Sequence, residues 1–161
     1  MVAYLRRATP ETVSALATGS LKPQTVMFDG PEDGLIDCDK AWHALHFLLT
    51  GDPGHSDHPM SVLVMDDAYL IGADEVGLGG YWLIEPAQVQ RLHAELDGLT
   101  DEAIARRYDP VAMAAGHVYL SDLFEEEGDA ALPYVMQGVP KLRAVSRAAA
   151  DAGDYIIGML I

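Results

Sequence analysis

The chain has 161 residues, half of them hydrophobic, and its 25 acidic and 10 basic side chains give a formal net charge of −15. Such a charge repels nucleic-acid phosphates and anionic lipid heads, and no apolar run approaches the roughly 20 residues needed to cross a bilayer, so we expect neither nucleic-acid nor membrane partners. Cys38 is the only cysteine, which rules out an intramolecular disulfide and favours a reduced, cytoplasmic location.

The N-terminal part of the chain alternates strand and helix signals. Residues 2–7 predict a strand, and Thr9, followed by Pro10 in the first helical position, predicts a helix that ends at Gly19. The apolar residues 24–28 predict a second strand.

A Gly- and Pro-rich turn at 29–34 comes next. A helix around Trp42 follows this turn and ends at Gly51. Residues 52–59 then form a loop that contains two prolines and two histidines.

The apolar residues 61–72 fit a strand or a helix, and a glycine turn follows them. This turn leads to a predicted strand at 81–84, after which Pro86 opens an amphipathic helix. The turn glycines are Gly77, Gly79 and Gly80, and the apolar face of the helix consists of Val89, Leu92, Leu96 and Leu99.

Short helices are predicted after Thr100 and after Asp109, whose side chains can cap them. Residues 120–129 form an acidic connection. A long helix follows, is interrupted by two prolines and ends at Gly153, and residues 155–161 form the last strand. The apolar face of the long helix consists of Val135, Val139, Leu142, Val145 and Ala149, and the two prolines are Pro133 and Pro140.

Strands interleaved with helices predict an α/β fold, in which a mixed β-sheet is covered by helices on both faces. An α+β arrangement is the alternative, and an all-helical fold fits the pattern less well. Because no linker is long enough to separate two domains, residues 1–161 are expected to form a single domain.

The helix around Trp42 carries a dense group of chemically active side chains. Asp39, His43 and His46 follow one another at spacings of four and three residues and share one helical stripe. A carboxylate one turn from an imidazole can orient it and raise its basicity, as a hydrolytic site requires. The sequence offers no matching nucleophile, so no catalytic residue is predicted. The alternative is that Asp39 caps the helix and His46 makes a satisfied hydrogen bond at the edge of the core.

Two histidine pairs raise the question of a metal site. His43 and His46 lie on the predicted helix, whereas His55 and His58 lie in the loop after it. Metalloprotease helices place two histidines four residues apart with a glutamate between them, which this helix lacks, and the loop has the composition of an exposed turn. We therefore predict no metal and no other cofactor.

Residues 122–129 carry dense negative charge, with Leu123 and Phe124 beside it. An exposed apolar pair next to acidic residues suits the docking of a basic protein. The alternative is a solvated loop with Phe124 turned inward. The predicted partner surface consists of Asp122, Phe124, Glu125, Glu126, Glu127 and Asp129.

The chain resembles a known family along nearly its whole length. The most specific part is Asp37-x-Asp39-Lys40-Ala-Trp42-x-x-Leu45-His46-x-Leu48-Leu49-Thr-Gly51, and weaker pieces lie at 81–83, at 86–89, between 107 and 119, and at 148–153. This pattern is similar to the central motif of the YfbM-like bacterial proteins, the domain of unknown function numbered 1877.

The resemblance implies a compact α/β domain with a sheet between helices. It implies no reaction, because the family has no established catalytic residues. The chain departs from the family pattern where Leu120 follows Tyr119, since a proline is expected there. The motif positions, together with His43, form the candidate pocket: Asp37, Asp39, Lys40, Trp42, His43 and His46.

Charge, size and the missing catalytic group predict a non-enzymatic cytoplasmic protein that uses its acidic surface to bind another protein. One version is an immunity-like protein that neutralises a basic toxin or effector. The rival prediction is a small-molecule-binding protein or hydrolase with a cleft around Trp42, His43, His46 and Asp39. A third is a structural subunit with a large apolar self-interface. The sequence does not determine the oligomeric state.

Overall fold

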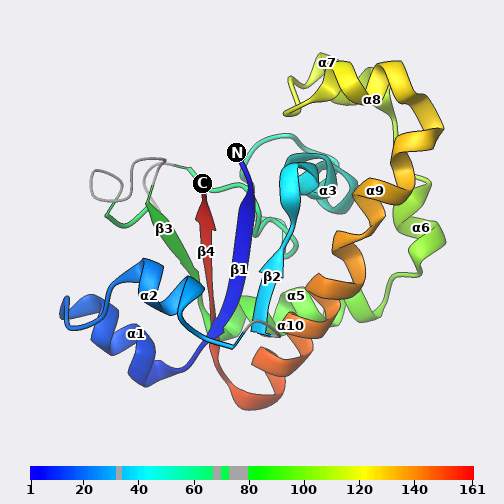
Figure 1. Ribbon diagram of the computed structural model, residues 1–161. Helices are drawn as coiled ribbons and strands as arrows, with labels where there is room; N and C mark the ends of the chain where they lie inside the picture. The colour runs from blue at the N-terminus through cyan, green and yellow to red at the C-terminus, as the bar shows by residue number, and fades with distance from the viewer. Residues whose placement is uncertain (32–33, 67–69, 73–79) are drawn as a thin grey trace.

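A four-stranded antiparallel sheet forms the centre of the computed structural model, which describes residues 1–31, 34–66, 70–72 and 80–161 (Figure 1). The first and last strands of the chain pair along the middle of this sheet, with Leu5 opposite Gly158. The strands are β1 (Ala3–Ala8), β2 (Leu35–Asp37), β3 (Tyr81–Ile84) and β4 (Tyr155–Leu160), in the order β2-β1-β4-β3.

Gly158 leaves room for the indole of Trp82 on one face of the sheet. A Cβ at this position would overlap the Trp82 ring, so another residue fits only if the ring moves. The Trp82 side chain is buried, and its Nε1 donates a hydrogen bond to the carbonyl oxygen of Val62 at 3.1 Å. This bond fixes the loop after Gly51 to the sheet.

The predicted helix caps are present. Thr9 accepts from the backbone N–H of Thr12 at 3.3 Å, and Thr100 accepts from that of Ala103 at 3.1 Å. Within the described residues, every helix falls short of the length and apolarity that a bilayer crossing needs. The helices are α1 (Pro10–Ala17), α2 (Pro23–Phe28), α3 (Trp42–Thr50), α5 (Pro86–Asp97), α6 (Asp101–Ala105), α7 (Pro110–Ala115), α8 (Ser121–Glu127), α9 (Leu132–Met136) and α10 (Gly138–Ala152), with 3-10 turns η2 (Asp39–Ala41) and η4 (Gly128–Ala131).

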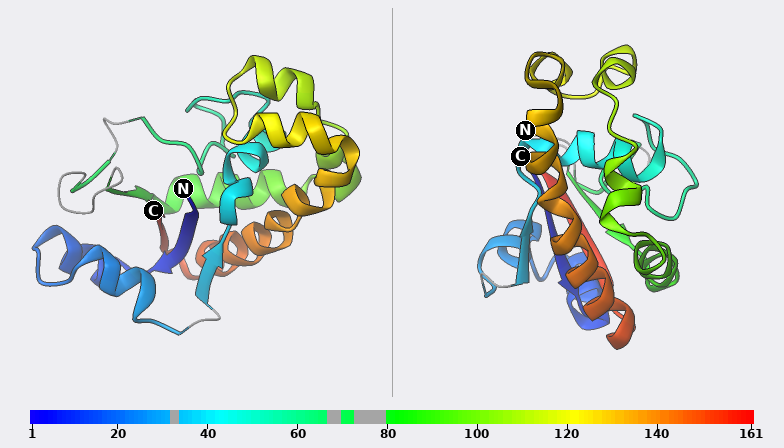
Figure 2. Two further views of the ribbon diagram at one scale, coloured as in Figure 1. Left: turned by 45° about the horizontal axis from the view of Figure 1, so that its top comes forward. Right: turned by 90° about the vertical axis from the view of Figure 1, so that its right-hand side faces the viewer.

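The two faces of the sheet are covered by different helices (Figure 2). Helices α3, α5 and α10 pack on the face that carries Leu5, Trp82 and Ile156. Helices α1 and α2 pack on the face that carries Ile157 and Met159. This arrangement confirms the predicted combination of a sheet with helices on both faces. Because the pairings between the four strands are antiparallel, it takes the α+β form of that prediction.

Helices α7 and α8 lie beside each other at one end of the molecule, beyond the sheet (Figure 1). Three buried side chains from this region, Met113, Val118 and Phe124, belong to the main core. The α7–α8 pair is therefore anchored to the sheet domain and carries its other side chains outward.

The predicted strand at 24–28 is wrong, because these residues form helix α2. Pro23 stands at the start of the helix, where its fixed φ and missing N–H are compatible with helical structure. Met27 is fully buried against the sheet, while Phe28 is 42% exposed and meets the Tyr4 ring edge-on. So short an apolar run fits either structure, and the need to cover the second face of the sheet selects the helix.

Strand β2 takes the place of that second strand, and its three residues are too few for an alternating pattern to predict it. The residues 120–129, expected to be a connection, form helix α8 and the turn η4. Leu120, which precedes α8, has a φ of 64°. Proline has a φ near −65°, so the proline expected from the resemblance cannot take this conformation.

The ambiguous residues 61–72 are irregular where the structure describes them, apart from a bridge between Ile71 and Tyr81. Gly80 precedes β3 with a positive φ of 78°, which a glycine adopts readily. The predicted turn at Gly77 and Gly79 lies outside the described residues.

Candidate functional site

The candidate pocket begins at the turn that leads into α3. Asp37 accepts a hydrogen bond from the backbone N–H of Asp39 at 2.7 Å, and Asp39 has a positive φ of 49°. The Asp39 carboxylate accepts from the hydroxyl of Tyr134 at 2.9 Å and does not cap the helix. The predicted capping role of Asp39 is therefore wrong, because Asp37 makes the turn and α9 brings Tyr134 to the Asp39 carboxylate.

Trp42 is 5% exposed and belongs to the main core. Its ring stacks on that of His43, with centroids 4.9 Å apart and planes 10° apart. It also stacks against Tyr119, at 6.1 Å. The indole Nε1 is buried without a hydrogen-bond partner among the described residues. Trp42 therefore presents no exposed face on which a ligand could stack.

The imidazole of His43 has both ring nitrogens engaged by backbone groups. Its Nε2 lies 2.7 Å from the carbonyl oxygen of Pro53, which can only accept, so Nε2 carries the proton. Its Nδ1 accepts from the backbone N–H of Tyr119 at 2.9 Å. Burial lowers the pKa of His43, against the opposing effect of the Pro53 carbonyl. The neutral ring therefore has no free lone pair for a metal or a substrate proton.

His46 is completely buried one turn further along α3. Its Nε2 donates to the carbonyl oxygen of Gly54 at 2.8 Å, while Nδ1 is buried without a partner in the described part of the chain. Burial lowers the pKa of His46 to about 4, although the Gly54 carbonyl and Asp52 oppose the shift. The two helix histidines thus hold consecutive carbonyls of one loop.

That loop, residues 52–64, is ordered by its own side chains. Asp52 accepts from the N–H of Gly54 at 2.8 Å. His58 Nδ1 accepts from the N–H of Met60 at 3.1 Å, and His55 Nδ1 lies 3.1 Å from the carbonyl oxygen of Val64. The loop histidines therefore stabilise the loop itself.

The two histidine pairs do not converge on one point. Within the described residues, no group of three or more His, Cys, Asp or Glu side chains is arranged to hold a metal ion. Cys38 is buried, and burial raises the pKa of its thiol to about 12, so a thiolate is strongly disfavoured.

The remaining motif side chains lie on the surface. Asp37, Asp39 and Lys40 are exposed, and the ammonium of Lys141 on α10 donates to the carbonyl oxygen of Asp37 at 2.7 Å. Burial and the bond to Asp39 raise the pKa of Tyr134 to about 12. These groups fasten α9 to the turn η2 and α10 to the edge strand β2.

Several hollows of the described surface lie away from this motif. One, of about 980 Å³, is lined by α1, α2 and the residues around Ile71, and another, of about 520 Å³, lies beside Arg6 and Arg7. Trp42 and His46, which the rival prediction places around a cleft, are buried.

The predicted partner surface lies on the helix α8 and the turn η4. Five acidic side chains on α8 and η4 are exposed, and we call them the acidic ridge: Asp122, Glu125, Glu126, Glu127 and Asp129. Phe124 is fully buried, so its place on the partner surface is wrong, because it anchors α8 in the core. Leu123, at 36% exposed, is the apolar side chain that remains beside the ridge.

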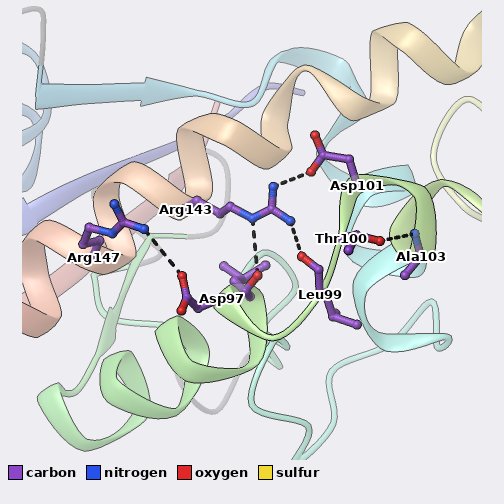
Figure 3. Close-up of polar contacts among 8 residues, drawn as sticks. Asp97, Leu99, Thr100, Asp101, Ala103, Arg143 and Arg147 are labelled. Carbon is purple, nitrogen blue, oxygen red and sulfur yellow. Dashed lines mark hydrogen bonds and ion pairs between the residues drawn. The ribbon is translucent and has the colours of Figure 1, made fainter.

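Basic side chains elsewhere are mostly bound within the chain. Arg143 on α10 forms an ion pair with Asp101 and donates to the carbonyl oxygens of Leu96 and Leu99, and Arg147 lies 3.5 Å from Asp97 (Figure 3). These contacts join α10 to the end of α5.

The N-terminal arginines are bound in the same way. Arg7 forms an ion pair with Asp154 at 3.0 Å, and the buried Arg6 donates to the carbonyl oxygens of Met27 and Pro31. Arg107 donates to the last carbonyls of α3, those of Leu48 and Leu49. Within the described residues, four basic side chains have no such polar contact: Lys22, Lys40, Arg91 and Arg106.

Sequence reasoning missed the partners that fix the candidate site: Tyr119, Tyr134 and the carbonyls of Pro53 and Gly54. A backbone carbonyl has no sequence signature. Tyr119 lies in the resembling segment, which was the one signal that pointed to it.

Comparison with known proteins yields two findings. The family model described as "Domain of unknown function (DUF1877)" matches residues 1–159. The chain is similar to the crystal structure of YfbM from Escherichia coli, described as a protein of unknown function, with 19% identity, a TM-score of 0.73 and coverage of 100% of both chains. No curated protein matches the chain. At this identity the structural likeness shows the fold alone.

Proposed function

This chain belongs to the DUF1877 family of domains of unknown function, and from that premise we propose that it is a non-enzymatic protein whose acidic ridge binds a basic surface of another protein. The cytoplasm is the proposed location, since the single cysteine needs no oxidising compartment. One concrete version is an immunity-like protein that covers the basic surface of a toxin or effector.

The observation that carries this proposal is the unequal pairing of charges. Arginines face the acids at the end of α5, whereas the ridge acids have no basic partner among the described residues. The ridge is therefore an unneutralised negative surface, which attracts and orients a basic partner.

The position of the glutamates on α8 adds a second argument. Glu125, Glu126 and Glu127 fill the last turn of the helix, where the backbone carbonyls already make the end negative. Negative charge at that end destabilises a helix by a few tenths of a kcal/mol per residue. Exposed residues that lower the stability of the fold are expected at functional sites, so these glutamates are better explained by binding than by folding.

The candidate pocket gives less support to the rival function. His43 has both nitrogens bonded, and Trp42 and His46 are buried. A general base needs an accessible lone pair near a substrate proton, which neither imidazole offers in this geometry.

A ridge variant tests the proposal. The triple substitution E125Q/E126Q/E127Q removes charge while keeping side-chain size, and E11Q/E95Q/D151N removes the same charge from exposed positions on α1, α5 and α10. We expect the wild-type and control proteins to bind a basic protein from the native host, with an affinity that falls as salt rises, and the ridge variant to bind at least about tenfold more weakly.

The binding partner is identified first by capture from the host, and its affinity is then measured with purified proteins. Equal affinity of the ridge variant and the control would show that the ridge is not the binding surface. Failure to find any stoichiometric basic partner would contradict the proposed function itself.

A further inference from the structure

Three segments that are distant in sequence meet at the ring of His43: helix α3, the loop 52–64 and the turn 117–120. The ring donates to Pro53 and accepts from Tyr119, at 2.7 and 2.9 Å. We call this ring with its two bonds the His43 clasp. Because one partner can only accept and the other can only donate, a single neutral tautomer satisfies both.

The turn held by the clasp has a strained backbone. His117 and Leu120 have φ values of 55° and 64°, in the left-handed region that is unfavourable for residues with a Cβ. Leu120 immediately precedes α8, so its φ sets the direction in which the helix leaves the core. Release of Tyr119 would allow both residues to return to negative φ.

We propose that the His43 clasp is a proton-sensitive hinge: protonation of His43 releases Tyr119, relaxes the turn 117–120 and changes the orientation of α8. A protonated ring carries N–H groups on both nitrogens, so Nδ1 would face the N–H of Tyr119 with two donors opposed. The bond to Pro53 survives this change, so the loop stays bonded to α3, while the turn loses its bond to the ring and keeps the core contacts of Val118. This inference concerns the movement of α8 and holds whatever α8 binds.

The groups around the ring favour His43 over His46 as the sensor. His46, on the same helix, is completely buried, and its ring centroid lies 6.4 Å from that of His43. Its Nδ1 has no acceptor for an added proton among the described residues. Asp52 and His55, from the loop, act on His46 with opposite signs. Tyr119 faces the cluster from the turn, where its ring stacks on that of Trp42 and its hydroxyl accepts a hydrogen bond from the N-terminal ammonium of Met1 at 3.1 Å. Burial lowers the pKa of both histidines, so the hinge stays closed at neutral pH.

Nuclear magnetic resonance of the full chain tests the hinge without any variant. The ring-nitrogen shifts should show His43 as the neutral Nε2–H form at about pH 7.5. As the pH falls to about 4.5, protection of the amides of Tyr119 and α8 against hydrogen exchange, corrected for intrinsic rates, should fall at least about tenfold together with the His43 ring signal. Protection of β1 and β4 should follow only the acid-induced loss of global stability and should not track the His43 ring signal.

Two variants complete the test. His43→Asn keeps an acceptor for Tyr119 but cannot titrate, so the loss of protection in α8 beyond that of the sheet should disappear from this range. His93→Gln, which removes a histidine of α5 outside the clasp, should leave the transition unchanged. The proposal is overturned if His43 titrates while the α8 amides stay protected, if the Nδ1–H form is found, or if the protection of α8 falls only in step with that of the sheet.

Discussion

The end of α5 and the acidic ridge contain the same kinds of side chain in opposite situations. Asp97, the last residue of α5, and Asp101, the first residue of α6, face arginines that project from α10. On the ridge, the acids face solvent, and within the described residues no arginine or lysine pairs with them. A local sequence rich in acids therefore says little about its role; the role depends on whether another element brings basic side chains to it.

The largest expected effect concerns the anchor of the ridge. Phe124→Ala should lower the free energy of unfolding by about 3–5 kcal/mol, because it empties a fully buried site in the core. Leu123→Ala, on the exposed side of the same helix, should change it by less than about 1 kcal/mol. Urea denaturation measures both. Similar losses for the two variants would mean that α8 does not pack through Phe124.

The second prediction concerns the buried histidine His46, which makes the free energy of unfolding depend on pH. The pKa of His46 is about 4 in the folded protein, below the ordinary 6.5. The stabilisation that the neutral, buried ring provides is therefore complete above pH 6.5. It is lost as the pH falls toward about 4, because the unfolded chain binds a proton that the folded protein does not. The loss should be on the order of 3 kcal/mol.

Denaturation curves at several pH values measure this loss, and His46→Gln provides the comparison. The variant should be less stable than the wild type at neutral pH, and its stability should fall less steeply between pH 6.5 and about 4. Identical slopes would show that other groups cause the acid sensitivity.

The two arginines of α10 that face Asp101 and Asp97 should contribute unequally to stability. Arg143→Ala should cost about 1–3 kcal/mol, because it removes donors to the Leu96 and Leu99 carbonyls as well as an ion pair. Arg147→Ala should cost less than about 0.5 kcal/mol, since both it and Asp97 are largely exposed. Thermal unfolding of the two variants decides the matter, and equal shifts in Tm would contradict the distinction.

The smallest expected effect has the opposite sign. The triple variant E125Q/E126Q/E127Q should be equally stable or more stable by about 0.5 kcal/mol, because it removes like charges and unfavourable charge at the end of α8. Asp101→Asn should instead lower stability, because it weakens the pair with Arg143. A clear loss of stability in the triple variant would show that the ridge glutamates have stabilising contacts and serve the fold.

Local sequence signals predicted the elements whose formation depends on neighbouring residues. The cap at Thr100, the apolar face of α5 with Val89, Leu92 and Leu96, and the closing strand β4 are all present where they were expected. Each depends on residues within a few positions of one another, so spacing and residue type suffice.

The tertiary structure decided the rest, because the deciding partners are far away in sequence. Tyr119 lies 76 residues from His43 and turns a candidate base into a bonded ring, while Arg143 lies 42 residues from the Asp101 that it pairs. The core likewise buried Phe124 and converted residues 24–28 from an expected strand into α2. Composition fixed the chain's negative charge, but only folding determined which acids would find a cation and which would remain open to a partner.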